Sequence, residues 1–583
     1  MKFKLWCLLL TCLSHFVILA QRENDTIKTE KLIIIKQYSP TLNDAFKVRS
    51  KPIISDSIKK QQKTVEYSIF SVPVASTFTP SKGTASSISP QARPYSFQNY
   101  ARLGAGNFTN IMAEFLGKVY LNRYQDLEVD FDHFSSAGGI ETEPLDNNFM
   151  DTSLGLKFQS SDRYLVWHAG VDIDYKRYNW YGFDEDLLND SNQLFGDDLS
   201  VIDPLQTYLG LNLNGGLDFD SDYIKTLDLN VKNLTDNYNS SENEVDINSG
   251  FEFYVANNSL DLDVNFNFLS GNFDQQYNIP DNGIKYGFLT TALQPSMQFE
   301  IDDLFLDVGL KGVFLNDTEI KESDFFVYPK VKATYKFAEE FMLYGGLDGD
   351  LNMNSYESVV DQNPFVSPTL FLQPTDNAFT GFTGLNGKIK TLSYNLKVFY
   401  QQENNYAFFI ENSAVPGLLV FEPQNNFEYG NSFSLIYDDL TTFGLSAEAN
   451  YEAFDSFNVG LSAQYFNFSL DNLPVAPYLP EFKFSLNANY QITDKWFLHS
   501  TLFYIGERES LRYTAIPLND TFFDSSGVDG FVDINFGIDY QLNERIGLFI
   551  TGRNLLDNNY QQWRNFDVQG IQVMGGLSYQ FDW

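Results

Sequence analysis

Histidines are few in this chain, and their spacing argues against a catalytic or metal-binding centre. After the first twenty residues only His133, His168 and His499 remain. They lie far apart in separate alternating segments, and none has a second histidine at a spacing that suits zinc. A surface hydrolase would need one of them beside a serine or an aspartate. We therefore expect no catalytic residues, no metal ligands and no cofactor, and we do not expect an enzyme.

Acidic oxygen ligands are dense in one expected loop. They are Asp184, Glu185, Asp186, Asp190, Asp197 and Asp198. Such carboxylates could bind calcium, but the glycine that a compact calcium loop needs after its third ligand is absent. We expect a solvated acidic loop. The short run Gly104-Ala105-Gly106 lies in an expected strand with no helix after it, so it does not indicate a nucleotide site.

The elements that must position these residues are strands. From about Ala101 onward the chain is a series of alternating segments, such as Leu260 to Phe268 and Val532 to Leu542. Successive side chains of a strand point to opposite faces, so each segment has one apolar face and one face rich in Asp and Asn. No apolar run after the first twenty residues reaches the length of a membrane-spanning helix. A closed barrel with a wide, wet interior fits this pattern, because closure removes the open edges.

Short and long connections alternate along the chain. Short ones include Arg123 to Asp126 and Asn543 to Arg545, and long ones include Gly182 to Pro204, Tyr356 to Phe379 and Glu507 to Gly527. Short periplasmic turns and long outer loops are typical of bacterial outer-membrane barrels. We predict an all-β fold: a transmembrane antiparallel β-barrel of about 22 strands over residues 101–583. It would lie in the lipid of a Gram-negative cell outer membrane, with its N-terminus in the periplasm.

The C-terminal segment, from Ile571 to Trp583, alternates down to an aromatic last residue. Its outer face carries Leu577, Tyr579, Phe581 and Trp583. This ending resembles the assembly signal of outer-membrane barrels. We expect the barrel-assembly machinery to be a partner that reads these four residues.

The N-terminal hundred residues differ from the rest. Residues 1–20 have a charged start, an apolar run and a small residue, Ala20, as expected of a secretory signal, and both cysteines lie there. Residues 21–100 are rich in Pro, Ser and Lys and carry 12 Lys and Arg against 6 Asp and Glu, whereas residues 101–583 carry 25 against 70. We expect an extended basic periplasmic leader that is attracted to the acidic barrel, and no nucleic-acid partner.

Two motifs carry a resemblance to a known family. Gly552 to Asp557, which reads GRNLLD, resembles the Asn-Leu-Leu-Asp signature of the penultimate strand in TonB-dependent receptors. Pro477 to Tyr490 is similar to the strand that follows a proline-bearing loop in that family. The resemblance implies a 22-stranded outer-membrane receptor barrel. Such receptors carry a folded plug domain of well over a hundred residues, whereas only about 80 residues separate the expected signal from the first strand here. We therefore expect a plugless branch with no folded plug domain.

One receptor feature survives in the leader. The segment with Glu30, Leu32, Ile33, Ile34 and Ile35 resembles a TonB box, the extended stretch that pairs with the energising protein TonB. Such pairing is strand addition, which β-branched residues favour. The alternative is an apolar strand that tethers the leader to the barrel wall or to another periplasmic protein.

Two functions remain open from the sequence. The first is a receptor-type barrel that passes a solute, and its acidic lumen would favour neutral or cationic solutes. The second is a closed scaffold that docks partners. The lumen would be filled by the leader, by infolded loops or by a partner, and we favour the leader with the loops. The apolar tip in Asn412 to Phe427 could dock a surface lipoprotein or fold inward.

Overall fold

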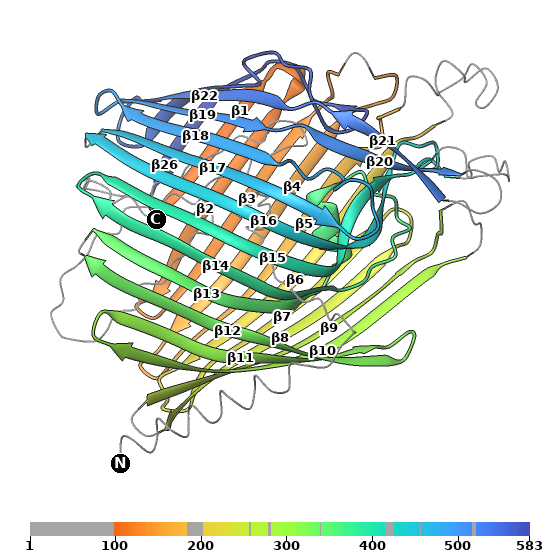
Figure 1. Ribbon diagram of the computed structural model, residues 1–583. Coiled ribbons are helices and arrows are strands. Elements are labelled where there is room, and N and C mark those ends of the chain that lie inside the picture. Colours follow the sequence, from red (N-terminus) through yellow and green to blue (C-terminus); the bar gives the residue numbers. More distant parts are fainter. Residues whose placement is uncertain are drawn as a thin grey trace.

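The strands of the protein form one closed antiparallel β-barrel (Figure 1). The computed structural model describes residues 98–140, 143–183, 202–255, 258–277, 282–338, 340–413, 425–454, 456–515 and 521–582. Strand β1 pairs with β2 on one side and with β26 on the other, so the first and last strands close the ring. The described residues are all-β apart from helix α4 and one short 3-10 turn.

The elements have the following bounds. The first half contains β1 (Asn99–Gly106), η1 (Asn107–Thr109), β2 (Ile111–Asn122), β3 (Gln125–Ser136), β4 (Phe149–Ser161), β5 (Leu165–Asn179), β6 (Leu205–Phe219), β7 (Ile224–Asp236), β8 (Ser241–Val255), β9 (Asn258–Phe273), β10 (Ile284–Ile301), β11 (Leu304–Asp317), β12 (Glu322–Ala338) and β13 (Phe341–Asn352). The second half contains α4 (Tyr356–Gln362), β14 (Thr375–Ile389), β15 (Leu392–Glu411), β16 (Phe433–Phe454), β17 (Phe457–Leu470), β18 (Phe482–Gln491), β19 (Trp496–Ile505), β20 (Arg508–Ala515), β21 (Thr521–Val528), β22 (Phe531–Gln541), β23 (Ile546–Arg553), β24 (Gln561–Trp563), β25 (Phe566–Asp567) and β26 (Gln572–Phe581).

The ring itself contains 22 strands, as the sequence predicts. The main sheet has 24 strands, but β20 and β21 pair with each other, and among the described residues β20 makes only single bridges elsewhere, from Arg512 to Glu411 and from Glu509 to Pro477. Strand β19 pairs directly with β22, so the β20–β21 hairpin branches off the ring. The two small strands β24 and β25 form a separate pair.

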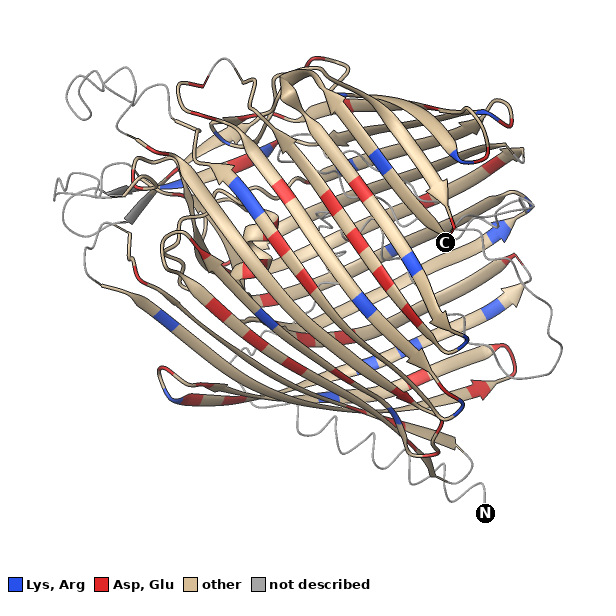
Figure 2. Ribbon diagram, turned by 180° about the vertical axis from the view of Figure 1, so that it is seen from behind, with Lys and Arg blue, Asp and Glu red and all other residues tan. Residues whose placement is uncertain are grey.

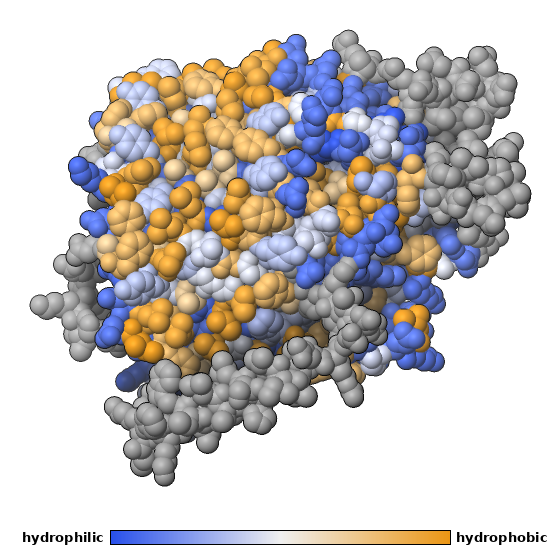
Figure 3. Space-filling model, in the orientation of Figure 1, coloured by the Kyte–Doolittle hydropathy of each residue, from blue (hydrophilic) through white to orange (hydrophobic). Residues whose placement is uncertain are grey.

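The apolar face of the wall points outward. On β6, Leu209, Leu211 and Leu213 are 49%, 40% and 48% exposed, although in a soluble sandwich this face would form the core. Figure 3 shows apolar residues over the middle of the outer surface, with hydrophilic residues gathered at the long-loop end. An outward apolar band is what lipid requires of a barrel. The predicted transmembrane barrel is therefore confirmed.

Adjacent residues of β6 give a test of this orientation. Replacing Leu211 with Arg places a charge on the lipid face, and we expect a loss of roughly 2–4 kcal/mol of folding free energy. Replacing the next residue, Asn212, with Arg should cost little, because Asn212 Nδ2 lies 3.2 Å from the Asp172 carboxylate inside the barrel. Urea unfolding in lipid vesicles measures both. Equal losses would mean that the two faces are not distinct.

Two segments expected to be long loops contain regular structure. Residues 507–527 contain most of the β20–β21 hairpin. Its sequence is polar and does not predict strands, because a hairpin outside the membrane needs no apolar face. Residues 356–379 begin with α4 and end inside β14. A helix of seven residues is too short to reveal its period in the sequence. The GRNLLD motif is also displaced: β23 ends at Arg553, and Asn554 and Asp557 have positive φ in the turn that follows.

Candidate functional site

The long loops fold inward and pack over one end of the barrel, at the right of Figure 1. We call this layer the cap. It joins the connections after β5, β13, β15 and β23 in one buried cluster, to which inner-wall residues also contribute. Its fully buried aromatic residues from these connections are Trp180, Tyr356, Phe365 and Phe427. Phe365 stacks on Phe566 at 4.1 Å, and its carbonyl accepts a bond from Trp180 Nε1 at 3.1 Å. Loops far apart in the sequence therefore close the mouth together.

A buried carboxylate of the wall holds the start of α4. Ser355 caps the helix through a capping box with Ser358. Glu242 of β8 accepts bonds from the backbone nitrogens of Tyr356 at 2.6 Å and Glu357 at 3.0 Å. A negative charge at a helix N-terminus satisfies the free N–H groups. The wall thus fixes the helix in the lumen by direct bonds to its backbone.

Ion pairs hold the outward surface of the same helix. Lys176 of β5 pairs with Asp361, and Lys232 of β7 pairs with Glu357 at 2.5 Å. The hydroxyl of Tyr356 donates to Asp236 at 2.8 Å. Burial, with the nearby Asp236 carboxylate, raises the pKa of Tyr356 well above its usual value, so it remains a donor. Two ion pairs from different strands of the wall therefore add to the apolar packing and the Glu242 bonds that hold the cap.

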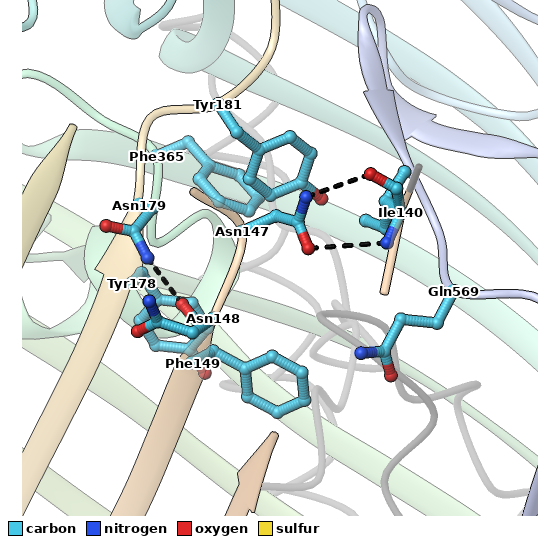
Figure 4. Close-up of a pocket in the computed structure, with 9 residues that line it drawn as sticks. All are labelled: Ile140, Asn147, Asn148, Phe149, Tyr178, Asn179, Tyr181, Phe365 and Gln569. Atoms are coloured by element: carbon cyan, nitrogen blue, oxygen red, sulfur yellow. Dashed lines mark hydrogen bonds between the residues drawn. The ribbon is translucent and has the colours of Figure 1, made fainter. Parts of the chain in front are cut away.

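A small pocket marks a seam beside the cap (Figure 4). Its lining combines aromatic rings with amides: Ile140, Asn147, Asn148, Phe149, Tyr178, Asn179, Tyr181, Phe365 and Gln569. The Asn147 side chain exchanges bonds with the backbone of Ile140. Asn179 Nδ2 donates to the carbonyl of Asn148 at 2.6 Å. These amides already form hydrogen bonds with the backbone of the loop between β3 and β4. The pocket therefore lies at a junction between loops of the cap.

The inner wall has two unlike halves. Figure 2 shows acidic residues repeated along the strands nearest the viewer. We call the inward face of β3 to β9 the acidic wall; it carries, among others, Asp130, Asp132, Asp172, Asp228, Asp246 and Asp263. The opposite half, β14 to β18, instead presents rows of lysine, aromatic and amide side chains.

One row of that second half carries a lysine at each end, on β15 and on β18. Lys397 pairs in register with Ser446, Ser446 with Gln464, and Gln464 with Lys483. The ammonium of Lys397 lies 5.0 Å from the Phe382 ring and 5.4 Å from the Phe399 ring. These are cation–π distances. We call Phe382, Lys397, Phe399, Phe466 and Lys483 the aromatic stripe.

The row above the stripe is polar and unsatisfied. Thr380, Gln401 and Thr442 are neighbours on β14, β15 and β16 and are 0% exposed. Within the described residues, their side-chain oxygens and the Gln401 amide nitrogen have no hydrogen-bond partner. Buried polar groups ordinarily have a hydrogen-bond partner. These three side chains are therefore available to bond a group that lies in the lumen.

A glycine makes room for the stripe. The Phe399 ring lies across Gly444, where an added Cβ would meet the ring at 2.1 Å. Replacing Gly444 with Val should displace the ring and separate Phe399 from Phe466, whose centroids are 6.2 Å apart. Replacing Gly460, where a Cβ would meet nothing closer than 4.0 Å, is the control. Near-ultraviolet circular dichroism of the folded barrels measures ring packing. A change for Gly444→Val alone is expected.

The residues singled out from the sequence are not brought together. Leu577 and Tyr579 of β26 face outward, 57% and 43% exposed, and Phe581 pairs with Asn99. The TonB-box-like residues, the acidic loop, the tip at residues 415–421 and Trp583 lie outside the described residues. His133, His168 and His499 sit on β3, β5 and β19.

The histidines have ordinary surroundings. His133 bonds Thr152 and Ser135, and His499 lies 3.2 Å from Asp539. No group of three or more metal-ligating side chains occurs in the described ranges. No helix of those ranges is long and apolar enough to cross a membrane.

The residues that hold the cap are not evident from the sequence. Glu242 reads as one more polar residue of an alternating strand, and its partner Tyr356 lies 114 positions further along the chain. Lys232 and Lys176 are equally inconspicuous. One sequence feature did indicate that the expected loop after Tyr356 is buried. It contains several apolar residues, including Val359, Val360 and Phe365.

The comparisons with known proteins agree with this architecture. None of the curated proteins matches the chain. The FrpB iron transporter from Neisseria meningitidis superposes with a TM-score of 0.61 at 12% identity, over 83% of this chain and 82% of that chain. The siderophore receptor PirA from Acinetobacter baumannii gives 0.59 at 10% identity, over 83% and 80%. The ferripyoverdine receptor of the Pseudomonas aeruginosa outer membrane gives 0.59 at 15% identity, over 85% and 72%. The family described as TonB dependent receptor-like, beta-barrel matches residues 79–555, and the chain belongs to this family.

Proposed function

We propose that this outer-membrane barrel passes a solute through its lumen, with energy supplied by TonB through Glu30 and Leu32 to Ile35. The observation that carries the proposal is the cap. It closes the mouth with loops held by ion pairs, the Glu242 bonds and apolar packing, so the closure is reversible while the 22-stranded wall stays intact. The family and the structural neighbours are transport receptors rather than enzymes, and we extend this by proposing no catalytic activity.

The wall suggests the class of solute. The acidic wall repels anions, as expected from the sequence. The aromatic stripe offers flat apolar rings, and the lysines and amides beside it donate hydrogen bonds. This combination suits a neutral solute with one flat apolar face and several hydrogen-bond acceptors.

Two further partners belong to this proposal. Leu577, Tyr579, Phe581 and Trp583 form the signal for the barrel-assembly machinery. A surface lipoprotein is a candidate partner at the long-loop end, through the expected apolar tip in Asn412 to Phe427.

Deleting residues 30–35 tests the energised version. Recovery of TonB with the barrel from native outer membranes should fall by roughly tenfold or more, because the strand-addition segment is gone. The amount of folded barrel should not change. Deleting residues 84–89, an equally short stretch of the same leader, is the control. Undiminished recovery of TonB would rule out this segment as the box.

A closed scaffold is the second candidate function, and the closed mouth favours it. The two candidates differ in what happens when the cap is loosened. A transporter should then admit a solute to its lumen, whereas a scaffold should keep its lumen filled and instead retain a stable set of envelope partners in purification.

A further inference from the structure

The β20–β21 hairpin leaves one sheet edge uncovered at the long-loop end of the barrel (Figure 1). Strand β20 is the inner strand, and its residues Ser510 and Leu511 are 1% and 0% exposed. Strand β21 is the outer strand, and its residues Asp524, Ser525 and Gly527 are exposed. Among the described residues β21 pairs only with β20. The backbone N–H and C=O groups along its other edge therefore face no strand.

This edge lacks the features that ordinarily protect an open edge. Proteins commonly block such edges with lysine, proline or a β-bulge. Strand β21 contains neither lysine nor proline, and its register with β20 is unbroken from Val528 to Thr521. A Cβ added to Gly527 would meet no atom within 4 Å, so the space over this part of the strand is open. A regular, open edge is a template for another strand.

The hairpin is fixed to the cap by two arginines of β20. Arg508 donates to the carbonyls of Gln561 and Gln562 at 2.7 Å and 2.8 Å, so β24 lies at the base of the hairpin. Strand β24 pairs with β25 and not with β21. Arg512 donates to the Glu411 carboxylate at 2.7 Å. Because the edge is held in place before a partner arrives, little conformational entropy is lost on binding.

The side chains beside the edge indicate which residues a partner would carry. On one face of the hairpin, Phe523 is the register partner of Tyr513, and the two ring centroids are 5.2 Å apart. On the other face, Asp524 is the register partner of Arg512, which donates to Glu411, and Asp524 is exposed. A strand laid beside β21 would place one residue next to Phe523 and the following one next to Asp524. An apolar residue suits the first position, and a basic residue suits the second.

We propose that β21 binds, by strand addition, an extended segment of another cell-surface protein in which apolar and basic residues alternate. A second copy of this chain is disfavoured as the occupant, because residues 101–583 carry 25 Lys and Arg against 70 Asp and Glu, and two such bodies repel each other. The hairpin branches off the ring, so this binding leaves the 22-stranded wall unchanged. This inference goes beyond the proposed transport and holds for a scaffold as well.

A synthetic peptide tests the backbone part of the inference. The probe is a labelled peptide of about ten residues that alternates valine and lysine, which is long enough to pair along β21. Fluorescence anisotropy measures its binding to the full-length barrel in detergent micelles. The same peptide with N-methyl groups on its valines keeps its charge but cannot pair, so we expect it to bind roughly tenfold more weakly or less. Equal binding of both peptides would mean that only the acidic charge of the barrel attracts them, and would overturn the inference.

A proline at the edge gives the matching test on the protein. The Ser526 carbonyl accepts a bond from the Ser510 hydroxyl at 3.1 Å, so it points toward β20. The N–H of the preceding residue, Ser525, therefore points away from β20. Ser525→Pro removes this N–H and should weaken peptide binding by roughly tenfold or more, whereas Ser525→Ala keeps it and should bind as the parent does. Unchanged binding by Ser525→Pro would overturn the inference, as would a dimer of the barrel that this variant abolishes.

Reversing one charge tests the side-chain part without altering the backbone. Asp524→Lys should weaken binding of the valine–lysine peptide and strengthen binding of a valine–glutamate peptide, by roughly threefold each. Asp494→Lys changes the net charge equally but lies in the turn between β18 and β19, and it should not reverse the preference. The same preference in Asp524→Lys as in the parent would overturn the inference. None of these experiments measures uptake, so a failure of the proposed transport leaves them interpretable.

Discussion

The variant Phe365→Ala should open the cap and expose the lumen to small reagents added from outside the cell. Phe365 is 0% exposed and packs on Tyr181 and Phe566, with ring centroids 5.6 Å and 4.1 Å away. Truncating a buried phenylalanine costs about 3–5 kcal/mol, which corresponds to a shift of roughly 10²- to 10⁴-fold between closed and open caps. The measurement is the rate at which an impermeant maleimide labels Asn230→Cys. Asn230 lies on β7, two residues below Lys232, which holds α4.

The matched control lies in the same loop. Phe371 is 54% exposed, so Phe371→Ala should leave the labelling rate unchanged. Both variants keep the wall intact, because neither residue belongs to a strand of the ring. If Phe365→Ala labels no faster than the parent while its loops become sensitive to protease, the cap is not the outer barrier. The barrier would then lie deeper in the lumen.

Removing residues 572–583 should abolish the barrel. This deletion removes β26, which pairs eight residues with β1 and eight with β23. Both neighbours would then present open edges to lipid, where each unsatisfied backbone group costs several kcal/mol. We expect the folded form, which migrates faster than the heated form on gels, to fall by roughly tenfold or more in outer-membrane fractions.

The control for this truncation is removal of a hairpin outside the ring. Replacing residues 508–528 with a short linker deletes β20 and β21, and because β19 already pairs with β22 the barrel should persist. A double variant, Tyr579→Ala with Phe581→Ala, keeps the backbone pairing and tests the side chains alone. Slow assembly of this variant would support the proposed signal. Normal assembly would mean that pairing alone suffices.

Much of the wall could be predicted from single segments of sequence. A strand repeats every two residues, so Leu209, Leu211 and Leu213 lie on one face. This apolar face can be predicted from the segment alone. The absence of long apolar runs and the alternation of short and long connections then favour a closed barrel, and the number of alternating segments gives its size as about 22 strands. Local information is sufficient because every strand of the wall has the same requirement, an apolar face toward lipid and a polar face toward the lumen.

The residues of the candidate site could not be predicted from single segments in this way. The sequence indicated that infolded loops could fill the lumen, but not which wall residues would hold them. Glu242 contacts Tyr356 across 114 positions, and Lys176 contacts Asp361 across 185. The β20–β21 hairpin was hidden for a related reason, since it stands outside the membrane and needs no apolar face.

The sequence by itself determined the all-β class, the closed outer-membrane barrel and the acidic character of its lumen, because each depends on a periodicity or on a sum of charges. Only the tertiary structure decided where the halves of the wall differ. The aromatic stripe exists because register places Lys397, Ser446, Gln464 and Lys483 in one row, and because Gly444 leaves space for a ring. Register and infolding depend on many weak contacts between distant segments, and no single segment records them.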